Sequence, residues 1–498
     1  MDIKWSVLPV LMVLLVITSC KKNFLDRQPL GRYTDADIPA GSYESKVFAA
    51  YAKLRANGFN GRDYTAIHSF RADESEKGST IQDGAPWADM YDDFQYNKSN
   101  GTLQTYWTDH YALIIAANEI IADIDSLQLN DAPTLVNKAE AKFLRAFAYF
   151  DLVRSFGQVP LITQKITDAA QVNKPKSTSD QIFALIDADL QEAASVLPVS
   201  WEARFIGRLT KGAALAMQAR AFLWRKNWSA ALGAAKSVID LNRYSLVPNY
   251  ISQFREEGEN GPESIFEIQA VYTPTQTNLG IEYANQQGVR GSGSWDLGWG
   301  WNTPTQNLVD SFETGDPRRT ATILYSGQPD PLYGQVVPSF PTVPRLYWNM
   351  KVYTNPADRL AKNSRFGQWM NHRIIRYADV LLMAAEAANE LGGTQNTDDA
   401  LKWLEMVRAR ARGTNNNILP KVTTTNQAAL RKAIQHERLV EFGMEEQRFF
   451  DLVRWGIDVE VMGAAGKTNY QTKHRLLPIP QAEIDKSGGV LIQNPDYQ

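Results

Sequence analysis

The sequence TKGAALAMQARAFLWRKNWSAALGAAKSVIDL, at residues 210–241, is the clearest indicator of fold class in this chain. Apolar residues recur at helical spacing on both sides of Asn227. Small residues stand at Ala219 and, twelve residues later, at Ala231, where they allow two helices to approach closely. The stretch therefore predicts two antiparallel helices in direct contact.

This spacing resembles a tetratricopeptide helical hairpin. A second hairpin is expected at Arg376 to Arg412, with a longer turn at Gly392 to Thr394. Further segments with helical periodicity are 43–55, 106–124, 135–156, 180–196, 374–391, 398–412 and 426–454. We therefore expect a mostly α fold, in which tetratricopeptide-like hairpins form a scaffold.

Residues 248–370 are rich in Gly, Pro, Asn and aromatic residues and have little helical periodicity. We interpret this segment as an irregular, loop-built ligand lobe on the scaffold, because loops held by a rigid scaffold often carry function. The expected organisation is a signal peptide (1–19), an N-terminal helical part (20–247), the aromatic-rich lobe (248–370) and a C-terminal helical part (371–498).

The N-terminus reads as a lipoprotein export signal. Lys4 precedes a short apolar run from Trp5 to Ile17, and Ile17-Thr18-Ser19-Cys20 matches a lipobox. The run is too short for a membrane span of roughly 20 residues. Cys20 is therefore expected to begin the mature protein and to carry the lipid anchor.

The bulk composition narrows the functional class. With 52 basic and 55 acidic residues the net charge is -3, and no long run of one sign occurs, so nucleic acid is not an expected partner. Cys20 is the only cysteine, which leaves no possibility of an internal disulfide. Aromatic residues reach 11%, and many of the 13 tryptophans lie in loop-like sequence.

Four longer segments, together with Asn23-Phe24-Leu25-Asp26 and the lipobox, carry a family resemblance. They are AEAKFLRAFAYFDLVRSFGQVPL (139–161), RYADVLLMAAEA (376–387), HERLVEFGMEEQRFFDLVRWG (436–456) and LPIPQAEIDKSGGVLIQNPDY (477–497). In this order they resemble the SusD/RagB family of outer-membrane nutrient-binding lipoproteins, over essentially the whole mature chain. Two departures are Leu439, where the family usually repeats arginine, and Asp496, where the closing motif has glycine.

The resemblance implies a lipid-anchored protein of the outer membrane that faces the cell exterior. It also implies capture of an oligosaccharide, or of peptide in some relatives, above a SusC-like TonB-dependent porin. Lys21-Lys22-Asn23 lacks the acidic residues often found in surface-exported lipoproteins, so the sequence leaves open which leaflet carries the anchor.

Charged residues in the third motif have a structural interpretation. Arg438, Glu441, Arg448, Asp451 and Arg454 lie three, seven, three and three residues apart. We expect them to form stabilising ion pairs on helix surfaces and not to contact ligand.

Motifs for familiar catalytic chemistry are missing from the sequence. No histidine pair has the spacing of a helical zinc site, and no nucleophile elbow occurs. We therefore expect no cofactor, no metal and no catalytic residue. Acidic residues cluster at Asp73, Glu74 and Glu76 and again at 89–93. We expect these residues to be solvated or helix-capping acids. A pair of glycosidase carboxylates and a calcium site remain as alternatives.

Two aromatic clusters are the candidate ligand site. Trp295, Trp299 and Trp301 stand among glycines, which let rings project from the backbone. Flat rings suit the apolar face of a pyranose, and neighbouring polar side chains can bind hydroxyls. The second candidate set is Trp87, Tyr91 and Tyr96 with Arg71 and Asp73. Packing inside the lobe is an equally good explanation for any single ring, although in family members the binding arc draws on loops like these two.

Three functions remain in competition. The preferred one is a non-enzymatic surface receptor for a glycan. A surface glycan-cleaving enzyme would require a close carboxylate pair, and a tetratricopeptide-type lipoprotein that assembles outer-membrane proteins would not need the aromatic lobe.

Overall fold

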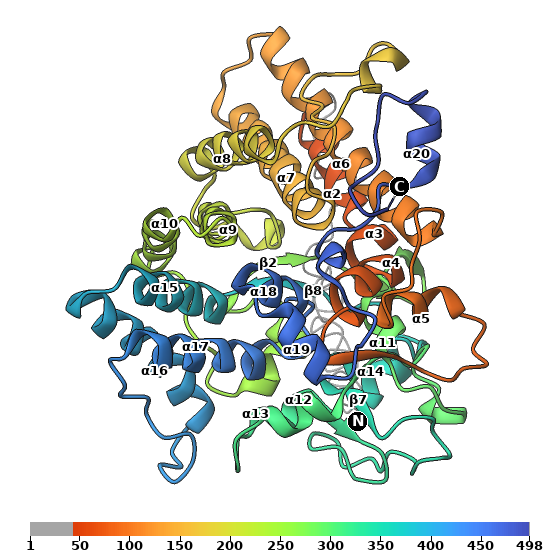
Figure 1. Cartoon of the computed structure of the whole chain (residues 1–498), viewed down its shortest axis with the longest axis vertical. Helices are drawn as coiled ribbons and strands as arrows, with labels where there is room; N and C mark the ends of the chain where they lie inside the picture. Colours follow the sequence, from red (N-terminus) through yellow and green to blue (C-terminus); the bar gives the residue numbers. More distant parts are fainter. Residues whose placement is uncertain (1–42, 498) are drawn as a thin grey trace, which may run out of the picture.

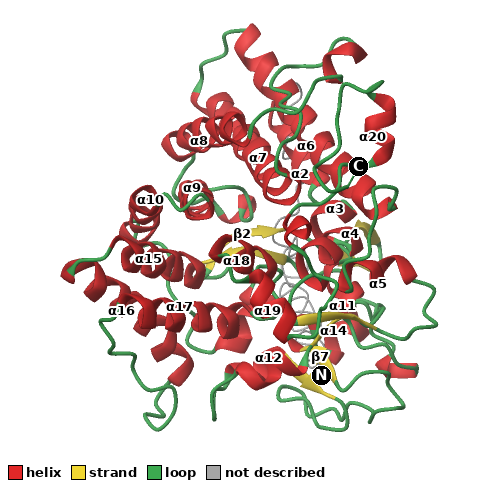
Figure 2. Ribbon diagram, viewed as in Figure 1, coloured by secondary structure: helices red, strands yellow, loops and turns green. Residues whose placement is uncertain are grey.

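The computed structural model of the protein describes residues 43–497. Helices dominate and the strands are few and short (Figures 1 and 2), which confirms the mostly α fold class. No helix within the described range has the length and apolar character needed to cross a membrane. Cys20 and the signal segment lie outside the described residues.

The longer helices are α2 (Tyr43–Lys53), α6 (Gly101–Ser126), α7 (Ala132–Phe156), α8 (Ser179–Val196), α9 (Lys211–Trp224), α10 (Trp228–Asp240), α15 (Tyr377–Leu391), α16 (Thr394–Arg412) and α17 (Gln427–Phe442). The shorter ones are α3 (Asn57–Asn60), α4 (Arg62–Thr65), α5 (Pro86–Asp92), α11 (Tyr283–Gln287), α12 (Gln306–Ser311), α13 (Arg318–Thr322), α14 (Pro356–Ala361), α18 (Arg448–Trp455), α19 (Asp458–Ala464) and α20 (Gln481–Lys486). The strands are β1 (Ser75–Gly78), β2 (Ser264–Ile268), β3 (Val271–Thr273), β4 (Gln276–Leu279), β5 (Trp301–Pro304), β6 (Ile323–Tyr325), β7 (Tyr347–Asn349) and β8 (His372–Arg376).

The long helices pack successively along the chain. Helix α6 packs on α7, α7 on α8, α8 on α9 and α9 on α10, after which α10 packs on α15 and α15 on α16. In Figure 1 the series begins at the top with α6, α7 and α8, and it ends at the lower left with α15, α16 and α17. Ala219 in α9 and Ala231 in α10 are fully buried. Their small side chains allow the two helices to approach closely. Both predicted hairpins are therefore confirmed.

Local sequence explains where several of these helices begin and end. The Thr210 side chain accepts a hydrogen bond from the backbone N–H of Ala213 at the start of α9. Gly392 and Gly393, between α15 and α16, have φ angles of 71° and 85°, which favour glycine. Gly157, the residue that follows α7, has a φ of 73°.

Two of the expected helices are wrong in part. Residues 374–376 belong to strand β8, which pairs with β2, and α15 begins only at Tyr377. The segment 426–454 is two helices, because Met444 and Glu446 adopt φ angles of 67° and 61°. Each left-handed residue costs about 1–2 kcal/mol. Tertiary contacts offset this cost: Met444 is fully buried, and Glu446 accepts a 2.9 Å hydrogen bond from Thr65 Oγ1.

Residues 248–370 form short strands and short helices around small hydrophobic clusters of their own. One such cluster contains Val289, Leu297 and Trp348. Two antiparallel pairings join the segment to the helical parts, β5 with β1 on the N-terminal side and β2 with β8 on the C-terminal side. The loops of this segment are thus held at two separate places by the helical scaffold.

The motif charges predicted to pair on helix surfaces are instead mostly buried between elements. Arg454 does pair with Asp451 within α18, at 2.8 Å. Arg438 joins Asp451 to Asp379 of α15, each at 2.8 Å, and Glu441 lies 3.1 Å from Arg376. Burial alone would raise the pKa of Glu441, but the guanidinium groups of Arg410, Arg376 and Arg318 outweigh it and hold the pKa at about 2. These residues connect different elements of the fold. The spacing of the charges within the motif does not indicate such contacts.

Candidate ligand-binding site

Strands β1 and β5 bring two of the predicted aromatic loops together. They pair antiparallel with Gly78 opposite Trp301, and the Ser79 N–H donates to the Gly300 carbonyl at 2.6 Å. A Cβ at Gly78 would lie 2.5 Å from that carbonyl, and Gly78 has a φ of 80°. Glycine is therefore required at this crossing, which places the loop before α5 beside Trp299 and Trp301.

Three tryptophans form a compact group at this junction, which we call the tryptophan site (Trp87, Trp299 and Trp301). The rings of Trp299 and Trp301 stack with centroids 5.7 Å apart and an interplanar angle of 23°. Trp87 meets Trp301 edge-on, at 5.5 Å and 89°. Trp301 is buried, Trp87 is half-buried, and Trp299 is 46% exposed. Trp299 thus offers an accessible aromatic surface supported from beneath by a fixed ring.

The orientation of Trp301 depends on a buried ion pair. Its indole N–H donates to Asp83 Oδ2 at 3.0 Å, and Asp83 lies 2.9 Å from Lys77 Nζ. Burial alone would raise the pKa of Asp83, but the hydrogen bonds from Lys77 and Trp301 outweigh it and lower the pKa below its usual value. Asp83 is therefore an ionised acceptor that holds the ring in place.

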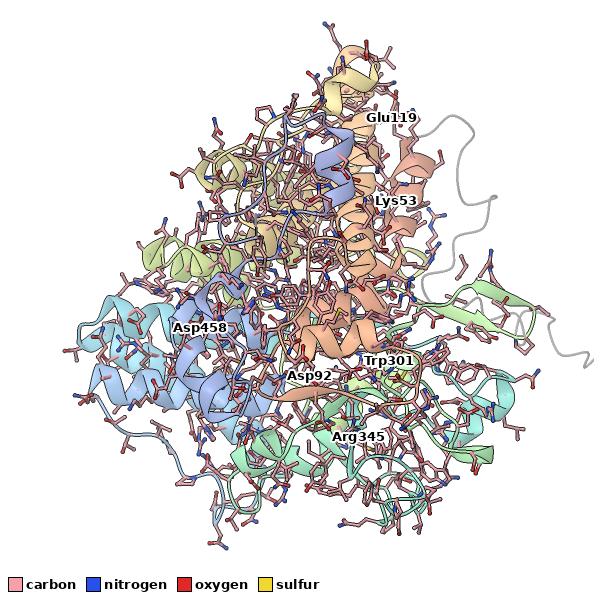
Figure 3. The ribbon with its side chains drawn as sticks, turned by 45° about the vertical axis from the view of Figure 1, so that its right-hand side comes forward. Lys53, Asp92, Glu119, Trp301, Arg345 and Asp458 are labelled. Carbon is pink, nitrogen blue, oxygen red and sulfur yellow. The ribbon has the colours of Figure 1, made fainter. Side chains whose placement is uncertain are left out.

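Arginine side chains surround the tryptophan site. The guanidinium of Arg62 lies 5.4 Å from the ring centroid of Trp87. Arg345 donates to the carbonyls of Gly78 and Ser79 and lies 3.3 Å from Glu76, and Figure 3 shows it below Trp301. Arg62 thus places a cation over a tryptophan ring, and Arg345 holds the backbone at the end of β1.

Arg290 is a further cation, next to the backbone that joins Trp299 to Trp301. A Cβ at Gly300 would lie 2.6 Å from the Cβ of Arg290, so Arg290 contacts the backbone between Trp299 and Trp301. It is half-buried, and its side chain forms no hydrogen bond or ion pair with any residue between 43 and 497. Its donors are therefore not used by the described part of the protein.

Trp295 does not join the other three tryptophans. Its ring lies parallel to that of Tyr353, with centroids 6.0 Å apart and an angle of 9°. The neighbouring Asp296 pairs with Arg365 at 2.9 Å. Because Tyr353 is buried and Trp295 only half-buried, this ring covers a hydrophobic cluster of the lobe.

Of the second predicted set, only Trp87 reaches the tryptophan site. Tyr91 and Tyr96 are buried and stack on each other at 4.9 Å. Arg71 is fully buried, with its guanidinium 3.9 Å from the Phe449 ring centroid. Asp73 is buried and accepts two hydrogen bonds from Arg448. In this structure these four side chains support the fold, and a ligand would have to displace protein to contact them.

The acidic clusters also differ from expectation. Asp93 is a solvated acid, as predicted: it is exposed and accepts from the Gln95 N–H in the turn that follows α5. Asp73 and Glu74 are wrong as solvated acids, because both are buried. Within residues 43–497 no group of three or more His, Cys, Asp or Glu side chains is arranged to hold a metal ion.

Sequence reasoning missed Arg62, Lys77, Asp83 and Arg345 as members of the site. Each is an ordinary charged residue in a segment without a motif. The β1–β5 pairing, between residues more than two hundred positions apart, brings Lys77 and Asp83 to Trp301. No sequence pattern in these segments indicates that β1 and β5 pair.

Comparison with known proteins identifies two matching family models. The model described as "SusD family" matches residues 262–497, and the one described as "Starch-binding associating with outer membrane" matches residues 23–223. The chain is similar to a SusD-like protein P2 of Formosa agariphila, with 28% identity over 98% of each chain.

Solved structures of similar proteins have the same fold. A SusD superfamily protein from Bacteroides vulgatus is 25% identical, with a TM-score of 0.75 over 91% of this chain and 98% of that one. The surface glycan-binding protein A of Bacteroides thetaiotaomicron in complex with laminarihexaose is 24% identical and has a TM-score of 0.75 over 91% of this chain and 98% of that one.

Proposed function

Because this chain belongs to the SusD/RagB family, we propose that it is a cell-surface receptor that binds an oligosaccharide and passes it to a SusC-like TonB-dependent porin. The observation that carries the proposal is the accessible ring of Trp299, stacked on a Trp301 that an ion pair holds in place. The binding protein itself would perform no chemistry on the ligand.

The tryptophan site has the chemistry that a sugar requires. The C–H face of a pyranose packs against a flat aromatic ring, and its hydroxyls need donors and acceptors at the ring edge. Arg62 and Arg290 supply donors, and Asp89, whose side chain is 50% exposed, supplies an acceptor at the start of α5. A ring that is already fixed loses little conformational entropy on binding.

The relatives support a glycan more than a peptide as ligand. One of the similar structures is described as a laminarin-binding SusD-like protein, and another holds laminarihexaose. Both of these proteins are 24% identical to this chain, so we choose laminarin-type oligosaccharides as the first ligands to test. A peptide ligand would be an outcome of the same screen.

The partner and the membrane anchor form the second half of the proposal. One matching family model describes association with the outer membrane, and the lipobox ends at Cys20. A cap that stays on a barrel in detergent would need to bury well over about 1,000 Å². Affinity purification from native membranes should therefore recover a TonB-dependent porin, and repeated recovery of none would contradict this half alone.

A glycan array probed with the mature protein tests the ligand half. We expect binding to one group of related oligosaccharides, confirmed by calorimetry on the best member. Chromatography of the bound sugar after prolonged incubation should return it at its original length. Absence of binding to every glycan would contradict the receptor proposal, and steady release of shortened sugars would replace it with the enzyme.

A further inference from the structure

A cavity lies well away from the tryptophan site. Its volume is about 190 Å³, and it lies between the end of α2, the loop at residues 206–208 and strands β2 and β4. Lys53, the last residue of α2, is labelled in Figure 3 high above Trp301. The two sites therefore share no side chain.

Most of the cavity wall is apolar. Leu54 and Ile268 are buried side chains of this wall, and Ile206 and Leu279 are half-buried ones. An apolar cavity of about 150 Å³ is large enough to hold benzene. A cavity of about 190 Å³ therefore accommodates a ring with a short substituent.

The charged groups in the wall are paired within the protein, with one exception. Arg208 forms a 2.6 Å ion pair with Glu140, and Glu267 lies 3.9 Å from Arg373 and accepts from Asn371 Nδ2 at 2.8 Å. The Arg55 side chain forms no hydrogen bond, ion pair or ring contact with any other part of residues 43–497. It is half-buried, and burial lowers its pKa from the usual value because no acid compensates. An arginine nevertheless keeps its charge in proteins.

We propose that this cavity binds a small organic acid, whose ring or alkyl body fills the apolar space while its carboxylate pairs with Arg55. Guanidinium and carboxylate are matched in charge and in hydrogen-bond geometry. A neutral sugar would leave Arg55 without an acceptor of full charge and would place hydroxyls against aliphatic walls. The cavity thus selects a ligand of a different class from that of the tryptophan site.

Phenylacetate and its neutral analogue phenylacetamide are suitable probes, measured by calorimetry on the mature full-length protein. We expect phenylacetate to bind at least ten times more tightly than phenylacetamide. Arg55→Gln should weaken phenylacetate at least tenfold, and Arg55→Lys should retain part of the affinity. Arg243 is the matched control, because it is an exposed arginine without a described partner that lines a neighbouring cavity. Arg243→Gln should bind phenylacetate like the wild type.

Ala52→Phe provides a test that does not depend on removing the charge. Ala52 is a half-buried residue of the cavity wall, so a larger side chain there should occupy the space and abolish binding. Trp299→Ala should leave phenylacetate binding unchanged. The proposal is overturned if phenylacetate fails to bind at millimolar concentration, if the amide binds equally well, or if Ala52→Phe binds normally. The last two comparisons remain decisive even if Arg55→Gln does not fold.

Discussion

Trp295 and Trp299 lie four residues apart in one glycine-rich segment, yet their rings have different surroundings. Trp299 is 46% exposed and stacks on Trp301, whereas Trp295 covers the buried ring of Tyr353. Glycine at 300, with a φ of 73°, turns the chain between Trp299 and Trp301. We therefore expect separate roles for these two residues, Trp299 in ligand binding and Trp295 in stability.

The first prediction concerns this difference. Trp299→Ala should weaken binding of the cognate glycan by about 1–3 kcal/mol, because an accessible aromatic anchor is lost, and should leave the melting temperature nearly unchanged. Trp295→Ala is the matched control, which should retain affinity and lose about 1–3 kcal/mol of stability. Calorimetry and thermal unfolding separate the two effects. Equal affinities for the wild type and Trp299→Ala would place the ligand elsewhere.

Glu74 is the acid whose burial should be measurable in the pH dependence of stability. It is buried, its Oε2 has no partner within the described chain, and burial together with Asp73 raises its pKa to about 8. The usual value of 4.5 applies to the unfolded state. Between these two values the unfolded chain releases the proton while the folded protein keeps it, so this group's contribution to stability falls as pH rises.

The second prediction follows from that sign. Glu74→Gln removes the titration, so the free energy of unfolding of the variant relative to wild type should rise by about 2–4 kcal/mol between pH 4.5 and pH 8. Urea unfolding at several pH values in this range measures the difference. A difference that stays constant with pH would show that Glu74 is already ionised in the folded protein.

Asp496 is one of the two departures from the family motifs, and its backbone conformation shows why glycine is usual at this position. It has a φ of 67°, a left-handed conformation that glycine adopts at little cost. The glycine usual in the closing motif therefore suits the backbone here, and aspartate is among the residues that tolerate it best. The departure therefore changes local backbone strain in the tail, at a position that is not part of the tryptophan site.

At the scale of elements, the break between α17 and α18 determines how the C-terminal helices meet the rest of the protein. It turns α18 so that Arg448 reaches Asp73, far away in the sequence, with hydrogen bonds of 2.8 and 3.0 Å. Burial alone would lower the pKa of Arg448, but Asp73 outweighs it and raises the pKa. This contact ties the last helices to the segment that leads into β1.

The third prediction compares this buried pair with an exposed one. Arg448→Ala should cost about 3–5 kcal/mol, because Asp73 would remain buried without its partner. The control is Arg431→Ala, which removes a similar two-bond contact to Glu390 from a side chain that is 37% exposed. Loss of this surface pair should cost about 0–1 kcal/mol.

Chemical unfolding of both variants measures the two costs, and binding by the folded fraction should be unchanged in each. A loss of affinity in Arg448→Ala at temperatures where it is fully folded would mean that this ion pair shapes the ligand site. Similar stabilities for the two variants would contradict the role of burial.

At the scale of the whole molecule, two antiparallel strand pairs hold the loop segment on the helical scaffold. The β1–β5 pair assembles the tryptophan site, and the β2–β8 pair connects the same segment to α15. The site therefore depends on contacts between parts of the chain that are distant in sequence. Attachment to the membrane, by contrast, is expected to involve only the N-terminal segment outside the described residues.

The fourth prediction tests that separation. Cys20→Ala should remove lipid incorporation and leave the protein either soluble or stuck at the signal-cleavage stage, while the folded body keeps its cooperative melting and its glycan affinity. Membrane fractionation with radiolabelled palmitate measures attachment, and calorimetry measures binding. Lipid incorporation and membrane attachment equal to those of the wild type would contradict the anchor.

Helices and hairpins were predictable from local sequence, because helical periodicity and small residues such as Ala219 and Ala231 act within a few turns. The family was recognisable from the four motif segments and the lipobox, in their order along the chain. Trp299 and Trp301 were recognisable as candidates because tryptophan and glycine are concentrated in one segment. Tertiary structure decided which rings meet. It joined Trp87 to Trp299 and Trp301, buried Tyr91 and Tyr96, and broke a helix at Met444. These outcomes depend on strand pairing, burial and ion pairs between distant residues, whose energies come from contacts that the local pattern does not contain.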